Sequence, residues 1–284
     1  MCRFVAYLGP PITLGSLITE PSNSLIHQSY DSHEQRRRFN GDGFGVAWYA
    51  PAISDEPALF RSVRPAWADP NLVQIARVTK SPCILAHVRA ASGNMPVARS
   101  NCHPFVHHTL TFMHNGRVGG FARIRRPLLD QLSDEAFNSI GGSTDSEHAF
   151  ALFVDHYRRT GRTESADALT EAMQSTINEI LDMTRAGATS EPSFLNFAVT
   201  DGRRAAITRF TTDSDGASET LYLHYGKRYT CSGGTCRMID MDQPGGAVLI
   251  SSEPLSTDPG WHEVPKQHIV TVETDRTVTV TPIE

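Results

Sequence analysis

A cysteine stands at position 2, directly after the initiator methionine, in the opening run MCRFVAYLG. If Met1 is removed, Cys2 carries a thiol and a free α-amine on one residue. An α-amine titrates near pH ~7.7–8.0, so it can accept the thiol proton directly or through a water molecule. The run therefore allows a terminal nucleophile with its own base. On this run alone, a small buried residue without a chemical role is the favoured alternative.

Three further positions carry the other groups that acyl transfer by a thiolate needs. In LTFMHNGRV, Asn115 offers a side-chain amide and Gly116 an unhindered backbone N–H, the donors that an oxyanion requires. In CILAHVRAAS, Arg89 stands in an otherwise apolar strand, and its guanidinium can bind a carboxylate through two parallel hydrogen bonds. In STDSEHAF, Asp145 begins an expected helix and can pair with a substrate ammonium.

Each of these residues also has a purely structural interpretation. Asn-Gly is a common hairpin dipeptide. A buried arginine usually has an internal carboxylate partner, and an aspartate in the first turn of a helix stabilises the helix dipole. The catalytic interpretation rests on the occurrence of all of them in one chain that begins with Met-Cys.

Composition limits the classes of partner. The 284 residues are 39% hydrophobic and 20% charged with a net charge of -5, which argues against nucleic acid or an anionic membrane as the main partner. The apolar runs have the length of strands, and the N-terminal run lacks an extended apolar segment and a cleavage site, so we expect a cytoplasmic protein. The five cysteines are too few and too scattered for a disulfide scaffold, and most are expected to be small buried side chains. The spacing of Cys231 and Cys236 in CSGGTC argues against a structural zinc site.

The elements that must position these residues are strands at both ends of the chain and helices between them. Strands are expected over 2–9, 41–50, 83–92, 110–118 and most of 194–284, and helices over 144–157 and 165–183. Asp201-Gly202 predicts a hairpin. Residues 23–40 are either a lid or an ordinary surface connection. No Pro/Ser-rich linker intervenes, so we expect a layered α+β fold and a single domain over residues 1–284.

Six short motifs, MCRF, GDGFG, HVRAAS, NCHPF, HNG and TDSE, occur in this order. Together they resemble the class II glutamine amidotransferases. The later SSEP and DPGW are similar to compact stand-alone members such as the γ-glutamyl hydrolase of the ergothioneine pathway. The resemblance implies an N-terminal-nucleophile hydrolase with a four-layer αββα sandwich.

The same resemblance implies roles for individual residues. Cys2 would be the nucleophile, and Asn115 and Gly116 would form the oxyanion hole. Arg89 would bind the α-carboxylate of a γ-glutamyl substrate, and Asp145 its α-amine.

Other matched positions would support the substrate. These are Gly43 in GDGFG, Ser92 in HVRAAS and His103 in NCHPF. Members that aminate sugar phosphates carry a Trp where this chain has Ala90, so ammonia channelling within the chain is not expected.

The expected activity is hydrolysis of a γ-glutamyl amide through a γ-glutamyl thioester, with release of glutamate and without a metal or an organic cofactor. The leaving group stays open: it is ammonia if glutamine is the substrate, or a larger amine, as in the ergothioneine pathway or in glutathione. A separate ammonia-accepting or peptidase subunit is a further partner that the resemblance admits. From another class, the alternative is a non-catalytic module that binds a γ-glutamyl ligand.

Overall fold

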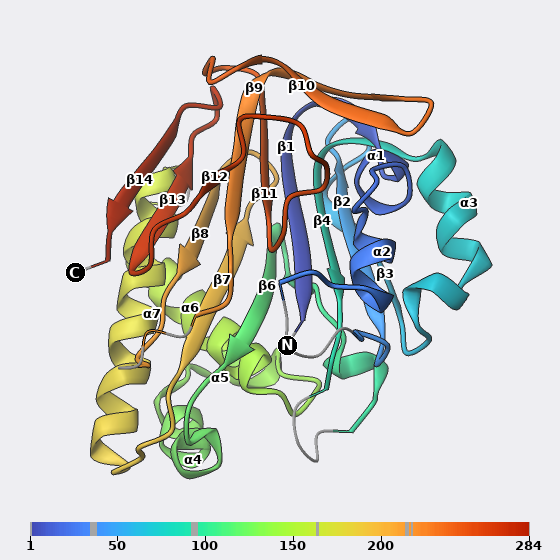
Figure 1. Cartoon of the computed structure of the whole chain (residues 1–284). Helices are drawn as coiled ribbons and strands as arrows, with labels where there is room; N and C mark the ends of the chain where they lie inside the picture. The colour runs from blue at the N-terminus through green and yellow to red at the C-terminus, as the bar shows by residue number, and fades with distance from the viewer. Residues whose placement is uncertain are drawn as a thin grey trace.

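Two antiparallel sheets form the centre of the molecule (Figure 1). The computed structural model describes residues 2–34, 39–91, 96–162, 165–213, 216 and 218–283. In spatial order, the first sheet contains β10 (Thr235–Met241), β9 (Tyr222–Ser232), β11 (Ala247–Ser251), β1 (Arg3–Thr13), β4 (Lys80–Val88), β2 (Phe44–Ala50) and β3 (Ser54–Ser62), with β12 (His262–Glu263) paired to β9. The second contains β14 (Val278–Pro282), β13 (His268–Val272), β8 (Ala205–Arg209), β7 (Phe194–Thr200), β6 (Leu110–Arg117) and β5 (Phe105–His107).

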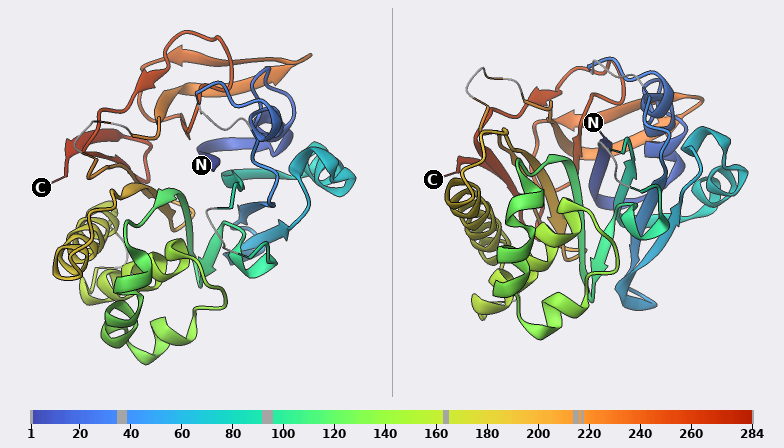
Figure 2. Two further views of the ribbon diagram at one scale, coloured as in Figure 1. Left: turned by 60° about the horizontal axis from the view of Figure 1, so that its bottom comes forward. Right: turned by 90° about the horizontal axis from the view of Figure 1, so that it is seen from below.

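Helices cover the outer face of each sheet (Figure 2). The first sheet carries α1 (Gly15–Ile18), α2 (Leu25–Tyr30) and α3 (Pro70–Val78). The second carries α4 (Phe121–Gln131), α5 (Asp134–Asn138), α6 (Asp145–Arg159) and α7 (Ala166–Ala186). Short 3-10 turns lie at η1 (Ala66–Ala68) and η2 (Arg99–Asn101). The four-layer αββα arrangement is confirmed.

Strand β1 lies in the middle of this arrangement and is buried on both faces, as its sequence predicts. Phe4 and Leu8 point into the apolar layer between the two sheets, where Met113 of β6 also lies. Val5 and Tyr7 point the other way, into the layer under α1–α3. Because neighbours on both sides cover it, a strand that begins at residue 3 is held in the core from its first residue.

Several helices were not predicted. Helix α3 begins with Pro70 at its first position, and the Asp69 carboxylate accepts the N–H groups of Asn71 and Leu72, a standard N-cap that the sequence contains. Helix α4 includes Pro127, which ordinarily argues against a helix interior. Helix α2 occupies part of the expected loop 23–40, of which residues 35–38 lie outside the described residues. Within the described residues, no helix is both long and apolar enough to cross a membrane.

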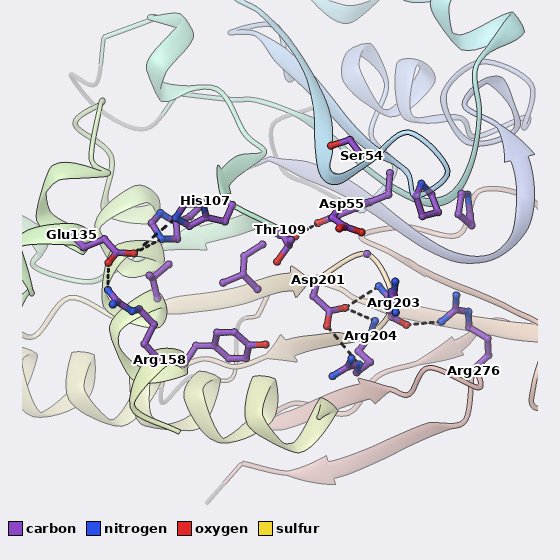
Figure 3. A pocket seen from close by; sticks show the side chains of 18 residues that line it. Ser54, Asp55, His107, Thr109, Glu135, Arg158, Asp201, Arg203, Arg204 and Arg276 are labelled. Atoms are coloured by element: carbon purple, nitrogen blue, oxygen red, sulfur yellow. Dashed lines mark hydrogen bonds and ion pairs between the residues drawn. The ribbon is translucent and has the colours of Figure 1, made fainter. Parts of the chain in front are cut away.

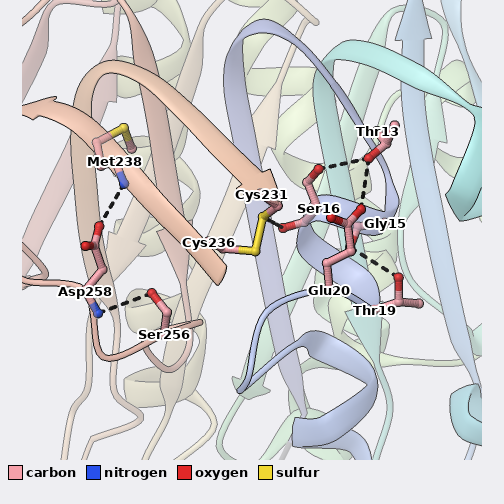
Figure 4. The surroundings of a disulfide bond; sticks show 10 residues. All are labelled: Thr13, Gly15, Ser16, Thr19, Glu20, Cys231, Cys236, Met238, Ser256 and Asp258. Atoms are coloured by element: carbon pink, nitrogen blue, oxygen red, sulfur yellow. Dashed lines mark hydrogen bonds between the residues drawn. A yellow bond between two sulfur atoms is a disulfide. The ribbon is translucent and has the colours of Figure 1, made fainter. Parts of the chain in front are cut away.

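A disulfide joins Cys231 of β9 to Cys236 of β10 (Figure 4). The two cysteines are directly opposite in the register of the hairpin, and the Gly233-Gly234 turn between the strands has positive φ at both residues. Sequence reasoning dismissed this pair because it considered scaffolds and metal sites rather than one cross-strand bond. The bond lies against α1, where Cys231 Sγ is 3.4 Å from Ser16 O. Cys83 and Cys102 are buried thiols, as expected.

A buried ion pair fixes the start of β1. Arg3 is fully buried, and its Nε donates to Glu253 Oε1 at 2.7 Å, directly after β11. Its Nη1 donates to the carbonyl of Cys2 and to Glu219, both at 3.1 Å. Glu253 also accepts hydrogen bonds from the Ser32 hydroxyl and from the backbone N–H groups of His33 and Glu34. The pair therefore ties the chain start, the end of β11 and the segment after α2 together.

The Glu253→Gln variant tests this pair. Burial alone would raise the pKa of Glu253, but the charge of Arg3 and the hydrogen bonds from Ser32 and His33 outweigh it and lower the pKa. Removing the carboxylate leaves Arg3 buried without its closest partner, and we expect a loss of about 3–5 kcal/mol in unfolding free energy at pH 7 by denaturant titration. As a control, Glu263→Gln breaks the Arg209–Glu263 pair, whose carboxylate is 55% exposed, and should cost less than about 1 kcal/mol.

The pH dependence has a definite sign. A carboxylate with a lowered pKa contributes stability that is complete above its unfolded pKa, about 4.3, and is lost as the pH falls through the folded value. The stability gap between the wild-type protein and Glu253→Gln should thus be constant near neutrality and narrow only below about pH 4. A gap that stays constant down to the acid unfolding transition would contradict a charged Glu253.

Candidate active site

A cavity of about 500 Å³ opens beside Cys2. Its wall includes five of the predicted site residues: Cys2, Arg89, His103, Gly116 and Asp145. They come from the start of β1, the end of β4, the loop before β5, the end of β6 and the first turn of α6. Residues from both sheets and one helix layer thus meet at one end of the sandwich.

The thiol of Cys2 points toward the chain that follows β4. The Ala90 N–H donates to Cys2 Sγ at 3.4 Å, and Sγ lies 3.6 Å from the Ala90 carbonyl. Cys2 is 8% exposed. Burial raises the pKa of the thiol, and the hydrogen bond from Ala90 lowers it in part. In this environment the thiolate needs a nearby base in order to form.

The sequence analysis placed Arg89 inside a strand. In the structure it follows directly after Val88, the last residue of β4. Its backbone is held by the Asp42–Gly43 loop: the Arg89 N–H donates to Gly43 O at 2.8 Å, and the Asp42 N–H donates to Arg89 O at 2.9 Å. The guanidinium is buried, and its contacts with the described residues are long, 3.5 Å to Asp42 O and 3.4 Å to Pro96 O. No carboxylate in the described ranges forms an ion pair with it. The structural alternative for Arg89, an internal salt bridge with a carboxylate, is therefore wrong within the described residues.

Gly43 and His103 lie behind and beside this arginine. Gly43 has φ 116°, and a Cβ there would lie 2.7 Å from Cys102 Sγ and 2.8 Å from Ser62 O. It supports Arg89 from outside the cavity wall. His103 lines the cavity and stacks on His87 with ring centroids 4.2 Å apart. Burial, and then the neighbouring His87, lower the pKa of His103 well below its usual value, so its ring is neutral.

Asp145 is the first residue of α6 and faces the cavity. Its carboxylate accepts the Val118 N–H at 2.7 Å and the Ser146 N–H at 2.9 Å. The predicted N-cap is present, because Thr144 Oγ1 accepts the Glu147 N–H at 3.2 Å. The Glu147 carboxylate does not return to Thr144, as a full capping box would require, but accepts the N–H groups of the 141–142 loop. Asp145 is thus fixed by backbone donors, and no cation in the described part of the chain forms an ion pair with it.

Asn115 and Gly116 lie inside β6 and are not in a turn, so the hairpin alternative is wrong. They pair with Asn196 and Leu195 of β7. Gly116 is in the cavity wall, and a Cβ on it would clash with the Phe194 carbonyl, which is why only glycine fits. Asn115 is fully buried, and its Nδ2 donates to Ser252 Oγ at 3.4 Å. Nδ2 carries a second hydrogen that this bond does not use.

The sequence analysis did not identify Ser252, which supports both β1 and the Asn115 side chain through hydrogen bonds. Ser252 Oγ accepts the Phe4 N–H at 3.1 Å as well as the Asn115 amide, and the Ser252 N–H donates to Phe4 O at 3.0 Å. The SSEP motif therefore connects the nucleophile strand to the Asn115 side chain. A signal was present in the sequence, since MCRF and SSEP place opposite charges beside two apolar strands. Ser92 lies outside the described residues.

Comparison with known proteins agrees with this geometry. The family described as glutamine amidotransferases class-II matches residues 17–213. The probable glutamine amidotransferase DUG3 of Saccharomyces cerevisiae is 41% identical over 303 residues, covering 100% of this chain and 84% of the yeast protein. The γ-glutamyl-hercynylcysteine sulfoxide hydrolase of Mycolicibacterium smegmatis is 29% identical, with 100% of both chains covered.

Solved structures show the same fold. A glutamine aminotransferase class-II domain protein from Silicibacter pomeroyi superposes with a TM-score of 0.68 at 28% identity and 100% coverage of both chains. Glutamine phosphoribosylpyrophosphate amidotransferase from B. subtilis superposes at 0.60 over 100% of this chain and 49% of its own, with 14% identity, which supports the fold alone. The chain, in which Cys2, Arg89 and Asp145 line one cavity, belongs to the class II glutamine amidotransferases.

Proposed function

We propose that this protein hydrolyses γ-glutamyl amides through a γ-glutamyl thioester on Cys2. The observation that carries the proposal is the charge arrangement around the thiol. The cavity contains a buried guanidinium, Arg89, and a carboxylate, Asp145, neither of which forms an ion pair within the described residues. A γ-glutamyl group carries an α-carboxylate and an α-ammonium, so it supplies the missing partner of each. Its γ-carbonyl is then free to reach Cys2.

The reaction begins when the Cys2 thiolate attacks the γ-carbonyl carbon. Negative charge develops on the carbonyl oxygen, and the Gly116 N–H and the remaining hydrogen of Asn115 Nδ2 are the donors assigned to it. The intermediate collapses to the thioester and expels the amine, which takes a proton from the protonated α-amine of Cys2. Water then hydrolyses the thioester, releases glutamate and restores the thiol.

The base requires removal of Met1. While Met1 is attached, the Cys2 nitrogen belongs to an amide and cannot accept a proton. Burial raises the pKa of the thiol, which makes spontaneous ionisation unfavourable near pH 7. The free α-amine of the processed chain, with a pKa near 8, supplies the base that the surroundings lack.

The size of the cavity supports a leaving group larger than ammonia. Beyond the Cys2–Arg89–Asp145 region its wall continues along Arg117, Phe121 and Glu191. These add a cation, an aromatic ring and a carboxylate that the glutamyl group does not need. A γ-glutamyl conjugate, of the kind cleaved in the ergothioneine pathway or in glutathione, uses this extra space, whereas glutamine leaves it to water. Release of glutamate from a panel of glutamine, glutathione, γ-glutamyl amines and hercynyl conjugates would rank the leaving groups.

We also propose that residues 1–284 work as one domain in the cytoplasm. Coverage of the whole chain by two relatives supports the first point. The mildly acidic composition and strand-sized apolar runs support the second. A separate subunit that accepts ammonia or degrades the released peptide is a partner compatible with this proposal.

Alkylation and mass measurement test the nucleophile. The intact mature protein should lack the mass of one methionine residue, because a small residue at position 2 permits Met1 removal. A glutamine-mimicking diazoketone should then add one equivalent, mapped by peptide mass analysis to Cys2. Cys2→Ala should lower glutamate release by a factor of about 10³ or more, while Cys83→Ala, a buried thiol in the core, should stay within about twofold.

Two results would refute the catalytic account. One is retention of Met1 in the purified protein, and the other is an adduct on Cys83 or Cys102 instead of Cys2. If Met1 is absent and γ-glutamyl ligands bind but no glutamate appears with any member of the panel, the protein is a binding module.

Arg89→Gln tests recognition of the α-carboxylate. The variant loses two charge-assisted hydrogen bonds to the substrate, so kcat/KM should fall by about 10²-fold or more, mainly through KM. Arg123→Gln changes an exposed arginine of α4 whose hydrogen bonds with the described residues go to the backbone carbonyls of Gly187 and Ala188; it is the matched control and should be neutral.

A substrate analogue completes the Arg89 test. 4-Aminobutanamide is glutamine without its α-carboxylate. The wild-type protein and Arg89→Gln should turn it over equally slowly, because the group that Arg89 binds is missing. An Arg89→Gln effect of the same size on both substrates would instead assign Arg89 to the fold.

A further inference from the structure

A second cavity, of about 590 Å³, lies at the opposite end of the strands from Cys2 (Figure 3). Leu110 and Pro82 line it, whereas Gly116 on the same strand β6 and Arg89 after the same strand β4 line the Cys2 cavity. Six residues of β-strand separate Leu110 from Gly116, which is about 20 Å. The second cavity is therefore separate from the proposed catalytic centre, and the reaction described above does not use it.

Three metal-ligating side chains gather on one side of this cavity. They are His107 at the end of β5, His108 directly after it, and Glu135 in the first turn of α5. One donor atom from each lies within 4.8 Å of the other two. His107 Nε2 is 3.3 Å and His108 Nε2 is 4.0 Å from the same oxygen, Glu135 Oε1. Ligands of a tetrahedral zinc ion with bonds of about 2.0–2.1 Å lie about 3.3 Å apart, so the donor spacing is close to that of an ion site.

The backbone explains how two consecutive histidines reach one carboxylate. In a regular strand, neighbouring side chains point to opposite faces. His108 has φ 51°, in the left-handed region, and this breaks the alternation at the end of β5. The two imidazole rings consequently lie on the same side, with centroids 4.5 Å apart.

The hydrogen bonding of the cluster suits a cation. Arg158 Nη1 forms an ion pair with Glu135 Oε2 and leaves Oε1, the oxygen that both imidazoles approach. A charged group that orients a ligating carboxylate through its other oxygen is a usual supporting contact in metal sites.

We propose that His107, His108 and Glu135 bind a zinc ion at the edge of the second cavity. Two imidazoles and one carboxylate are a donor set that zinc accepts, and three protein ligands leave a coordination position for water or for a ligand in the cavity. The ion would join the β5–β6 hairpin to α5. Across the cavity, Arg203, Arg204 and Arg276 lie opposite the cluster in Figure 3, and Arg204 is paired there with Asp201.

Zinc titration against a chromophoric chelator tests the site in the full-length protein. Cys2→Ala serves as the parent for all variants, since it removes a thiol that could take zinc in the other cavity. The parent should bind one equivalent, and Co²⁺ substituted at the site should give the absorption of a tetrahedral ion. His108→Gln on the parent should weaken zinc binding by about tenfold or more, and this side chain is 71% exposed, so the fold should tolerate the change. His107→Gln should act in the same direction.

His262→Gln is the matched control. His262 is also an exposed histidine beside a carboxylate, Asp242, but belongs to no three-residue cluster of described ligands. Its loss should leave zinc affinity unchanged. Zinc should also raise the melting temperature of the parent and not that of His108→Gln, because only a protein that binds the ion when folded is stabilised by it.

The alternative zinc site is the second cluster of described ligands, His27, Asp31 and His33. The proposal is wrong if His108→Gln and His107→Gln bind zinc as tightly as the parent. It is equally wrong if His33→Gln alone abolishes binding. None of these results bears on the γ-glutamyl hydrolase proposal, whose tests use Cys2 and Arg89.

Discussion

The structure depends on holding a chain terminus still. Chain ends usually fray, yet Cys2, the proposed nucleophile, lies one residue before a strand. The buried pair of Arg3 and Glu253 meets that constraint, since Arg3 also donates to the carbonyl of Cys2 itself. Burying two charges is costly unless their hydrogen bonds are complete. Glu253 receives donors from Arg3, Ser32, His33 and Glu34, which accounts for a carboxylate that stays ionised without solvent.

The same constraint links the strand that follows Cys2 to Asn115, one of the proposed oxyanion donors. Ser252, next to Glu253, bonds to both backbone groups of Phe4 and to the amide of Asn115. A shift of β1 relative to β6 would therefore break a hydrogen bond, as well as moving Cys2 away from Asn115. Two short segments, at the start of β1 and after the end of β11, thus set the distance between Cys2 and Asn115, although neither segment belongs to the second sheet.

Sequence reasoning succeeded where local patterns agree with tertiary packing. The doubly apolar β1, the Thr144 N-cap of α6, the apolar face of α7 and the Asp201-Gly202 hairpin are all present. It failed where local rules conflict with packing or compete with one another. No helix was predicted at α4, where Pro127 ordinarily disfavours a helix interior; it exists because Ile124 and Leu128 bury one face in the core with α6 and α7.

For the site, the residue types were predictable and their neighbours were not. Arg89 stood out because a guanidinium follows an apolar run. That it forms no ion pair with a described carboxylate depends on its contacts with Asp42 and Gly43, which the sequence does not reveal. The cross-strand bond of Cys231 depends on hairpin register, which no count of cysteines reveals. The stabilisation of β1 by Glu253 depends on its contact with Arg3. Local sequence patterns do not reveal a contact between two residues that lie 250 positions apart.

In the proposed reaction, the electrostatics of the cavity account for recognition of the glutamyl end of the substrate. Arg89 is 3% exposed, and among the described residues its guanidinium has two long contacts, both to carbonyl oxygens, which leave much of the cost of its desolvation uncompensated. The Asp145 carboxylate accepts the backbone N–H groups of Val118 and Ser146 and, at 3.4 Å, the Ser146 hydroxyl. A zwitterionic α-amino acid head neutralises both charges at once, whereas a simple carboxylate or amine satisfies one and leaves the other. Directly beside the thiol the wall is the uncharged backbone of Ala90, and the charged side chains of Arg117 and Glu191 also line this cavity. For the proposed γ-glutamyl substrate, Arg89 and Asp145 therefore account for recognition of the glutamyl head.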